Sequence, residues 1–444
     1  MDIYAEKGQY KLYHGNMLDM LDVIEAESVD SIVTDPPYEL NFMNKGWDNS
    51  GVAFQKGTWE KCFKVLKPGG YLLAFGGSRT FHRIACAIED AGFEIRDTIM
   101  WLYGSGFPKS MNIGLAIDKK NGVESIDTGE KINSMSSLGV MHDDNWKSKK
   151  GITRKISTNE WQGWGTALKP AYEPVIVARK PCEGSCVDNV MKYGVGGINI
   201  DECRVGTGTG NEKPKYKPNN KNNIFGKGLG DGEYENTNGR FPANTILTYD
   251  ETDFDEVCGG FPNTKSTGGS GDASKKNTFA NTYNGGLGDE GSASRYFYCA
   301  KASKRDRDEG LNMIPQKCND GRNKPIDNAF QRGETLRKNT HPTVKPTSLM
   351  QYLVRLVTPK GGVVLDPFNG SGSTGKAVMY ENKDRCKNYK YIGIELTEEY
   401  LPISKARIEY VCGLSEDDIE DETKSFIEND DKDNKSVGQQ LKLF

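Results

Sequence analysis

The sequence predicts an α/β fold built on a doubly wound, mostly parallel β-sheet. The first hundred residues alternate apolar runs with segments of helical periodicity, and the same alternation returns over residues 346–412. Such alternation favours a parallel sheet with helices on both faces. A chain of 444 residues can form one large domain of this kind with an insertion, or two domains.

Expected strands in the N-terminal part are the runs SVDSIVT, PGGYLLAFGG and IRDTIMWLYG. Helical periodicity separates them, first near Phe54 to Leu66 and then around Ile84 and Ile88. In an open α/β sheet, ligands bind at the carboxyl ends of such strands.

The C-terminal part predicts a βαβ unit. We expect a helix over 346–357, a strand over 362–366, a glycine-rich turn into another helix, and a strand that ends at Glu395 before a last helix. Between the two parts, residues 205–295 are rich in Gly, Asn, Lys and Thr, which predicts loops. Two α/β segments therefore flank an irregular middle.

Charge is distributed unevenly along the chain, although the net charge is only −4. Residues 415–435 hold ten acidic residues and three lysines, whereas residues 301–345 hold eleven Lys and Arg and six acidic residues. Phosphate responds to the local field, so the sequence permits a basic nucleic-acid surface beside an acidic, disordered tail.

Composition predicts a soluble protein of a reducing, cytoplasmic compartment, with no membrane partner. The ten cysteines are scattered, no run of 18 apolar residues occurs, and the start MDIYAEKGQYKL lacks the apolar stretch of a signal peptide. Cys182, Cys186 and Cys203 have a spacing that could suit zinc, but no fourth ligand stands at a matching short spacing. We therefore favour structural thiols and expect no metal.

A glycine-rich turn follows the strand that ends at Asp366, within VVLDPFNGSGSTGKA. Gly370 and Gly372 let the backbone turn tightly into a helix, whose unpaired N–H groups then face the strand ends. Glu395 ends the next strand, where a carboxylate can hold the hydroxyls of a ribose. This combination predicts a cofactor that carries a nucleoside.

The same letters permit another interpretation. Gly370 to Lys376 spells the G-x-x-x-x-G-K pattern of a phosphate-binding loop. Ala377, however, stands where magnesium needs a Ser or Thr, and Asp366 would repel phosphates. We favour the nucleoside cofactor over an NTPase and over a glycine turn that serves packing alone.

The strand SVDSIVT is followed by Asp35, Pro36, Pro37 and Tyr38. Each proline fixes its own φ angle and restrains the residue before it, so the Asp35 carboxylate and the Pro37 carbonyl can be held as neighbouring acceptors. Two such acceptors suit an amino group that donates both hydrogens, and the Tyr38 ring offers a face for a planar ring. The stretch therefore predicts recognition of an exocyclic amine on a nucleobase, in preference to a plain strand end with a solvated Asp.

TDPPY with a later DPFNGSGSTG resembles the amino-methyltransferases that modify adenine N6 or cytosine N4 in DNA with S-adenosylmethionine. The order of the motifs is similar to the β-class, circularly permuted arrangement, which implies a Rossmann-like fold with a large inserted target-recognition region. HPTVKP, KPGGYLLAFGG and WGTALKPAYEPVIVARKP also resemble segments of that family. The resemblance covers about residues 10–181 and 338–412.

This resemblance implies a role for each matching residue. Asp35 and the Pro37 carbonyl would accept hydrogen bonds from the target amine, and Tyr38 would stack on the flipped base. Asn16 stands where the family often has Asp, and its amide can still bond an adenine edge. The other residues expected around the cofactor are Asp366, Phe368, Gly370, Gly372 and Glu395, with Thr343 and Lys345 near the methionine carboxylate.

The implied function is site-specific methylation of a flipped base in double-stranded DNA. Bonding both amine hydrogens favours a tetrahedral nitrogen whose lone pair attacks the methyl group in line, so no cysteine nucleophile is required. Within the family, Asp-Pro-Pro-Tyr is more typical of adenine N6 and Ser-Pro-Pro-Tyr of cytosine N4, so we favour adenine over cytosine. Methyltransferases for RNA or a protein amide usually place the cofactor motif first, and a DNA-binding module with a dead site would not keep both motifs intact.

The resemblance also divides the chain. Aromatic and basic residues mix in GRFPANTIL and SRYFYCAKASKRDRDEG, which suits phosphate contacts and groove reading. The expected parts are the catalytic half 1–181, the target-recognition region 182–337, the cofactor-binding half 338–412 and the acidic flexible tail 413–444.

The segment Gln440 to Phe444, QLKLF, resembles the peptide with which bacterial DNA polymerases and repair proteins bind the replication sliding clamp. Apolar side chains on a flexible tether suit a pocket on another protein. We therefore expect the clamp as a second partner of a bacterial or phage-encoded protein, the alternative being that Leu441, Leu443 and Phe444 pack on their own domain.

Overall fold

The computed structural model describes a large part of the chain, and the statements below concern that part. The described residues are 2–40, 50–103, 110–131, 153–205, 239–248, 263–265, 290–292, 297–299, 305–312, 314, 317–318 and 336–413.

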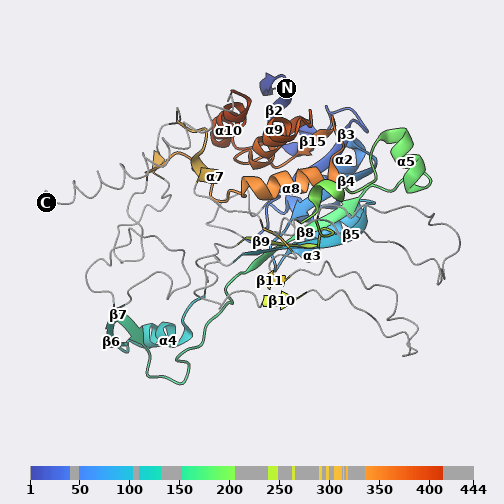
Figure 1. The fold of residues 1–444 in the computed structure, drawn as a ribbon. Helices are drawn as coiled ribbons and strands as arrows, with labels where there is room; N and C mark the ends of the chain where they lie inside the picture. The colour runs from blue at the N-terminus through green and yellow to red at the C-terminus, as the bar shows by residue number, and fades with distance from the viewer. Residues whose placement is uncertain are drawn as a thin grey trace, which may run out of the picture.

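A ten-stranded sheet forms the centre of the molecule, in the order β1-β2-β16-β15-β3-β4-β8-β5-β9-β12 (Figure 1). The run from β2 to β4 is parallel throughout, and so is the run from β5 to β12. Its strands are β1 (Asp2–Lys7), β2 (Tyr10–His14), β3 (Val29–Thr34), β4 (Leu66–Phe75), β5 (Glu94–Tyr103), β8 (Tyr172–Arg179), β9 (Thr245–Thr248), β12 (Tyr298–Cys299), β15 (Val363–Asp366) and β16 (Lys390–Glu395).

Helices cover both faces of this sheet. Successive side chains of each strand point to opposite sides, so the apolar runs present apolar side chains on both faces. Val33, Leu73 and Val364 belong to a core shared with the C-terminal helices. Their neighbours Ile32, Leu72 and Leu365 belong to a second core shared with α2 and α3. The helices on the first side are α8 (Thr347–Val357), α9 (Ser373–Arg385) and α10 (Leu401–Gly413), and those on the second are α2 (Lys56–Val65) and α3 (Phe81–Asp90).

Burial on both faces explains why the strands are continuous apolar runs in the sequence. The expected strands correspond to β3, β4, β5, β15 and β16, and the expected helices to α2, α3, α8, α9 and α10. The prediction of a doubly wound, mostly parallel sheet is therefore confirmed.

Strand β8 is the main departure from a simple alternation. It runs antiparallel to both of its neighbours, β4 and β5. Its first residues therefore lie at the sheet edge where the parallel strands have their carboxyl ends, and the N–H of Gly76 donates to the Pro174 carbonyl at 2.9 Å. This reversal adds side chains of β8 to the edge where ligands of such sheets bind.

Strands β9 and β12 come from the range 182–337 and extend the main sheet by parallel pairing. The division of the chain into four parts stays a prediction, and the acidic tail and residues 440–444 lie outside the described residues. Smaller elements are α1 (Met17–Met20), η3 (Val52–Phe54), α4 (Ile113–Asn121), β6 (Ile126–Lys131), β7 (Thr153–Ile156), α5 (Cys186–Tyr193), η5 (Asp201–Cys203), β10 (Asn263–Lys265), β11 (Glu290–Ser292), α7 (Arg305–Asp308), β13 (Lys317–Cys318), β14 (Leu336–Arg337) and η8 (Glu398–Tyr400).

Among the described helices, none has both the length and the apolar character needed to cross a membrane.

Candidate active site

A cavity of about 1540 Å³ opens at the carboxyl ends of β3, β15 and β16. Its wall joins segments that are far apart in sequence, from the N-terminal strands, the start of β8 and the loops around β15. Gly372 is absent from the lining; it is the N-cap residue of α9 and faces Ser404. The predicted residues that do line the cavity are Asn16, Asp35, Pro36, Pro37, Tyr38, Thr343, Lys345, Asp366, Phe368, Gly370 and Glu395.

Asp366 fixes the floor of this cavity at the junction of β3 and β15. Its carboxylate accepts hydrogen bonds from the hydroxyls of Thr34 at 2.7 Å and Thr374 at 2.6 Å, and from the N–H of Phe368 at 3.1 Å. Burial raises the pKa of Asp366 to about 6, although these three donors act in the opposite direction. The residue is thus held in one orientation by donors from both halves of the chain.

The glycine-rich turn has the backbone conformation that its sequence predicts. Gly370 and Gly372 have φ angles of 52° and 75°, in the left-handed region that favours glycine. A Cβ at position 370 would lie 2.9 Å from Nε2 of His341, and one at position 372 would lie 2.6 Å from Oγ of Ser404. Both glycines are therefore required by conformation and by space.

Glu395 lies at the end of β16 beside this turn. Its carboxylate accepts hydrogen bonds from the N–H groups of Gly370 at 2.6 Å and Thr397 at 2.7 Å. Burial raises the pKa of Glu395, while these N–H donors oppose the shift. Because a carboxylate oxygen has two lone pairs, both oxygens keep acceptor capacity toward the cavity.

The segment HPTVKP lines the cavity beside the glycine-rich turn. Burial of the His341 ring lowers its pKa to about 4, so the ring is neutral at pH 7. Its Nδ1 lies 2.5 Å from the Thr343 carbonyl oxygen, which can only accept, so Nδ1 carries the proton. Asn16 also lines the cavity, and its side chain caps α1 by accepting from the N–H of Leu18 at 3.0 Å.

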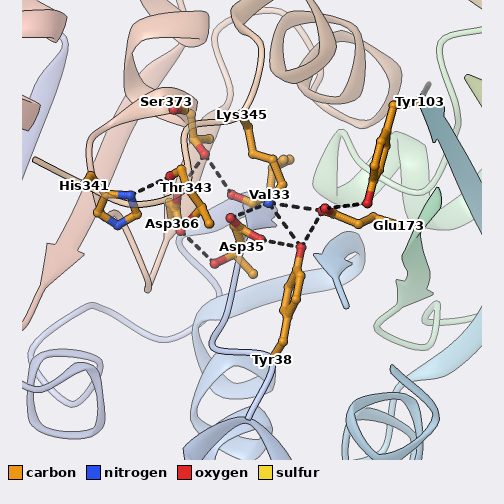
Figure 2. A network of polar contacts seen from close by, with 12 residues as sticks. Val33, Asp35, Tyr38, Tyr103, Glu173, His341, Thr343, Lys345, Asp366 and Ser373 are labelled. Carbon is orange, nitrogen blue, oxygen red and sulfur yellow. Dashed lines mark hydrogen bonds and ion pairs between the residues drawn. The ribbon is translucent and has the colours of Figure 1, made fainter. Parts of the chain in front are cut away.

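Lys345 connects Asp35 to a second carboxylate, Glu173 (Figure 2). Its Nζ lies 2.6 Å from Oδ2 of Asp35 and 3.3 Å from Oε2 of Glu173. The Tyr38 hydroxyl lies 2.9 Å from Oδ1 of Asp35 and 2.8 Å from Oε2 of Glu173, so its single proton can reach either acceptor. Tyr103 donates to Oε1 of Glu173 at 3.3 Å.

This cluster of Asp35, Glu173 and Lys345 carries one net negative charge. Burial opposes the charge of Lys345, but Asp35 and Glu173 outweigh that effect and raise its pKa. Burial and the same two carboxylates raise the pKa of Tyr38, which therefore stays a neutral donor. The sequence analysis placed Lys345 near a cofactor carboxylate, whereas in the structure its ammonium is bound to the residue expected to receive the target amine.

Lys376 has a different environment from the lysine of a phosphate loop. It is fully buried on α9, and its Nζ lies 2.5 Å from Oε2 of Glu309. Burial lowers its pKa to about 8. Because Lys376 does not line the cavity, the phosphate-loop interpretation is wrong.

Residues 305–311 contact the walls of the cavity, and Arg307 lines it. Arg407 is fully buried and donates to the carbonyls of Ser371 at 2.6 Å and Asp306 at 2.7 Å. Arg307 donates to the His341 carbonyl at 2.8 Å. Sequence analysis assigned the basic stretch around Arg307 to phosphate contacts; that assignment stays a prediction, and in the structure Arg307 also binds the cavity wall.

Sequence reasoning missed Glu173, Thr34 and Thr374. Glu173 stands before a proline at the start of an apolar run, and this signal could have identified an acidic strand end. The two threonines carry no comparable signal, because Thr is common in strands and at helix starts.

The protein has a Rossmann-like sheet with a cavity at the carboxyl ends of its strands, where ligands of this class of fold bind. The sequence profile of the N6/N4 DNA methylase family matches residues 29–406, and the chain belongs to that family. Members of the family use S-adenosylmethionine.

Among curated proteins, the type II methyltransferase M2.LlaDCHI of Lactococcus lactis subsp. cremoris is 33% identical over 118 residues, which are 22% of this chain and 43% of the relative. M.HindIII of Haemophilus influenzae is 24% identical over 140 residues, which are 31% of this chain and 35% of the relative. The chain thus spans less than half the length of these relatives.

Two solved structures are similar over most of their length. The cytosine-N4-specific PvuII DNA methyltransferase has a TM-score of 0.40 and 14% identity, and the match covers 94% of this chain and 91% of that one. The DNA modification methylase TTHA0409 of Thermus thermophilus, in complex with S-adenosyl-L-methionine, has a TM-score of 0.37 and 14% identity, with 91% and 95% covered.

The raised pKa of Asp366 predicts a pH dependence of stability. Between its ordinary value of 3.8 and about 6, the folded protein keeps a proton that the unfolded chain releases. The free energy of unfolding should therefore fall as the pH rises through this window, by about 3 kcal/mol relative to Asp366→Asn, and stay constant above it. Urea unfolding of both proteins at pH 4 to 7 measures the difference, and a difference that does not change with pH would contradict the assignment.

Proposed function

We propose that this protein transfers a methyl group from S-adenosylmethionine to the exocyclic amine of a base in double-stranded DNA, with adenine N6 as the acceptor. The observation that carries the proposal is that Asp35 and Pro37 line the same cavity as Asp366 and Glu395. The residues proposed to hold the amine and those proposed to hold the nucleoside thus border one space, as transfer between two bound molecules requires.

The cavity residues fit the methyl donor. Glu395 would hold the ribose hydroxyls, because both of its oxygens are fixed by backbone N–H groups and keep lone pairs for further donors. Phe368 offers an apolar wall, and a side chain at Gly370 would press on His341 and narrow the space. When bound, the donor supplies an electrophilic methyl group on a positively charged sulfur.

Asp35 and the Pro37 carbonyl would then receive the two amine hydrogens. The Asp35 carboxylate accepts from Tyr38 through Oδ1 and from Lys345 through Oδ2. An incoming amine therefore competes with the Lys345 ammonium for Oδ2. When Lys345 leaves Oδ2 of Asp35, its ammonium can stay charged because it remains paired with Glu173.

The charge of the cluster suits the reaction. As the amine nitrogen forms its new bond, it acquires positive charge, which the net negative cluster stabilises in a site of low dielectric constant. Asp35 is then the nearest base for the proton that the amine must lose. A neutral acceptor at position 35 would supply the geometry without this charge.

We favour adenine over cytosine as the acceptor base because of the first residue of the Asp-Pro-Pro-Tyr motif. This chain has Asp at position 35, and that residue is more typical of adenine acceptors in the family. One relative, DNA adenine methyltransferase YhdJ of Escherichia coli, is 32% identical over 79 residues, which are 18% of this chain and 25% of that protein. Cytosine N4 is the second candidate.

Nucleoside analysis after reaction tests the function directly. Unmethylated genomic DNA incubated with the protein and labelled S-adenosylmethionine should yield N6-methyladenine after digestion to nucleosides. Asp35→Ala should abolish the product, because it removes both an acceptor and the negative charge, while the dissociation constant of the cofactor should change less than about threefold. Labelled N4-methylcytosine would replace the adenine assignment, and activity of Asp35→Ala would remove the role of Asp35.

If Lys345 moves from Asp35 to Glu173 when the amine binds, the effects of substitutions at positions 173 and 345 on kcat should depend on each other. Glu173→Gln should lower kcat about 10- to 100-fold with little change in cofactor binding, because Lys345 then stays on Asp35. In Glu173→Gln/Lys345→Met the loss should be smaller than the product of the two single losses, since Asp35 no longer holds a competing cation. Tyr103→Phe removes the hydrogen bond from Tyr103 to Oε1 of Glu173 without touching Lys345, so this control should have a small effect. Multiplicative losses in the double variant would contradict the exchange.

Sliding-clamp binding stays a prediction that concerns residues 440–444 alone. Deletion of these residues should abolish retention of the protein on immobilised bacterial clamp, and methylation of a short duplex should be unchanged. The matched control replaces Lys442 with Ala, because the resemblance assigns no contact to that position. Failure of the full chain to bind the clamp would end the idea.

A further inference from the structure

Two cysteines outside the cavity lie next to each other at the start of α5. The Sγ atoms of Cys182 and Cys186 are 3.9 Å apart, and Cys186 is exposed to solvent. Neither residue lines the cavity, and α5 lies at the periphery of the molecule (Figure 1). Of the structural thiols expected from sequence, only Cys203 is buried in the core.

The backbone holds this pair in place. Gly184 has a φ of 76° and turns the chain so that Cys182 approaches the first residue of α5. A reciprocal capping box joins Ser185 and Asp188. Asn189 is fully buried, accepts from the N–H of Glu183 at 3.0 Å, and donates to the Pro68 and Val195 carbonyls at 2.9 and 2.7 Å. The two sulfurs therefore meet without ordering a flexible loop.

Arg179 makes the two thiols unequal. Its Nη1 lies 3.2 Å from Sγ of Cys186, and its Nη2 lies 2.7 Å from Glu94. Cys186 is also the first residue of a helix, where the helix dipole favours an anion. Hydrogen bonding to Arg179 lowers the pKa of Cys186, whereas burial raises that of Cys182. The exposed sulfur is thus the better nucleophile.

We propose that Cys182 and Cys186 form a reversible thiol-oxidation site that a peroxide converts to an intrachain disulfide. The Cys186 thiolate attacks one peroxide oxygen and breaks the O–O bond; with one proton taken up, this gives a sulfenic acid and water. The Cys182 thiol then attacks the sulfenic sulfur, which forms the S–S bond and releases the hydroxyl group with the thiol proton as water. In sum, two thiols and one hydrogen peroxide give one disulfide and two waters.

The geometry favours this product over the alternatives. A disulfide has an S–S bond of about 2.05 Å, so the two sulfurs, 3.9 Å apart, must approach by about 2 Å to form it. Among the described residues there is no group of three or more side chains that could hold a metal ion. Within that part of the chain, the pair therefore lacks the further ligands that zinc requires.

Peptide mass spectrometry of the full chain tests the proposal. After treatment with hydrogen peroxide and alkylation of the remaining thiols, the peptide that holds both cysteines should be two hydrogens lighter and unalkylated, and dithiothreitol should restore alkylation. Cys86, an exposed single cysteine, is the internal control and should stay open to alkylation at the same dose. Alkylation of both Cys182 and Cys186 after peroxide would overturn the proposal.

Variants separate the roles of the three residues. Cys182→Ser should stop at a Cys186 sulfenic acid that a cyclic diketone captures, and Cys186→Ser should give neither product. Arg179→Met should slow alkylation of Cys186 several-fold at pH 7, and Arg179→Lys should restore part of the rate. Equal alkylation rates for Cys186 and Cys86 in the wild-type protein, which needs no variant to fold, would also overturn the assignment.

Discussion

Parallel pairing of β3 with β15 is the interaction on which the rest of the site depends. Val364 and Leu365 lie opposite Ser31 and Ile32, so the two strands reach the sheet edge together. The hydrogen bond of 2.7 Å between Thr34 and Asp366 closes this junction. Both strands are buried on both faces, so a shift of register would move their side chains out of the packing that they now have. The position of the Asp-Pro-Pro-Tyr motif relative to the glycine-rich turn is therefore fixed.

Charge placement follows from this constraint. The cleft buries Asp366, Lys345 and Glu395 in a region where an unpaired ion is costly. Each has a partner from a segment distant in sequence: Asp366 from β3, Lys345 from the residue after β3 and from β8, and Glu395 from the glycine-rich turn. The site is thus assembled only in the folded chain, and one excess negative charge remains beside the position of the proposed amine.

Much of the fold could be predicted, because strands buried on both faces are continuous apolar runs and their helices keep a regular period. The glycines of the turn could be predicted for a local reason, since their φ angles depend on a few neighbouring residues. The acidic strand end at Glu173 has a local signal, but its pairing with Lys345 does not, because that contact requires β8 to run antiparallel between β4 and β5. Similarly, no local signal indicates that Arg307 donates to the His341 carbonyl, because this contact joins residues 34 positions apart.

The sequence by itself determined the α/β class, the Asp-Pro-Pro-Tyr motif that begins at Asp35 and the glycine-rich turn after Asp366, because each depends on residue types at short spacing. Only the tertiary structure decided that Lys345 is bound to Asp35 and Glu173, that Lys376 lies away from the cavity, and that two cysteine sulfurs meet beside Arg179. The physical reason is that electrostatic pairing depends on distance in space, and strand order in the sheet sets that distance.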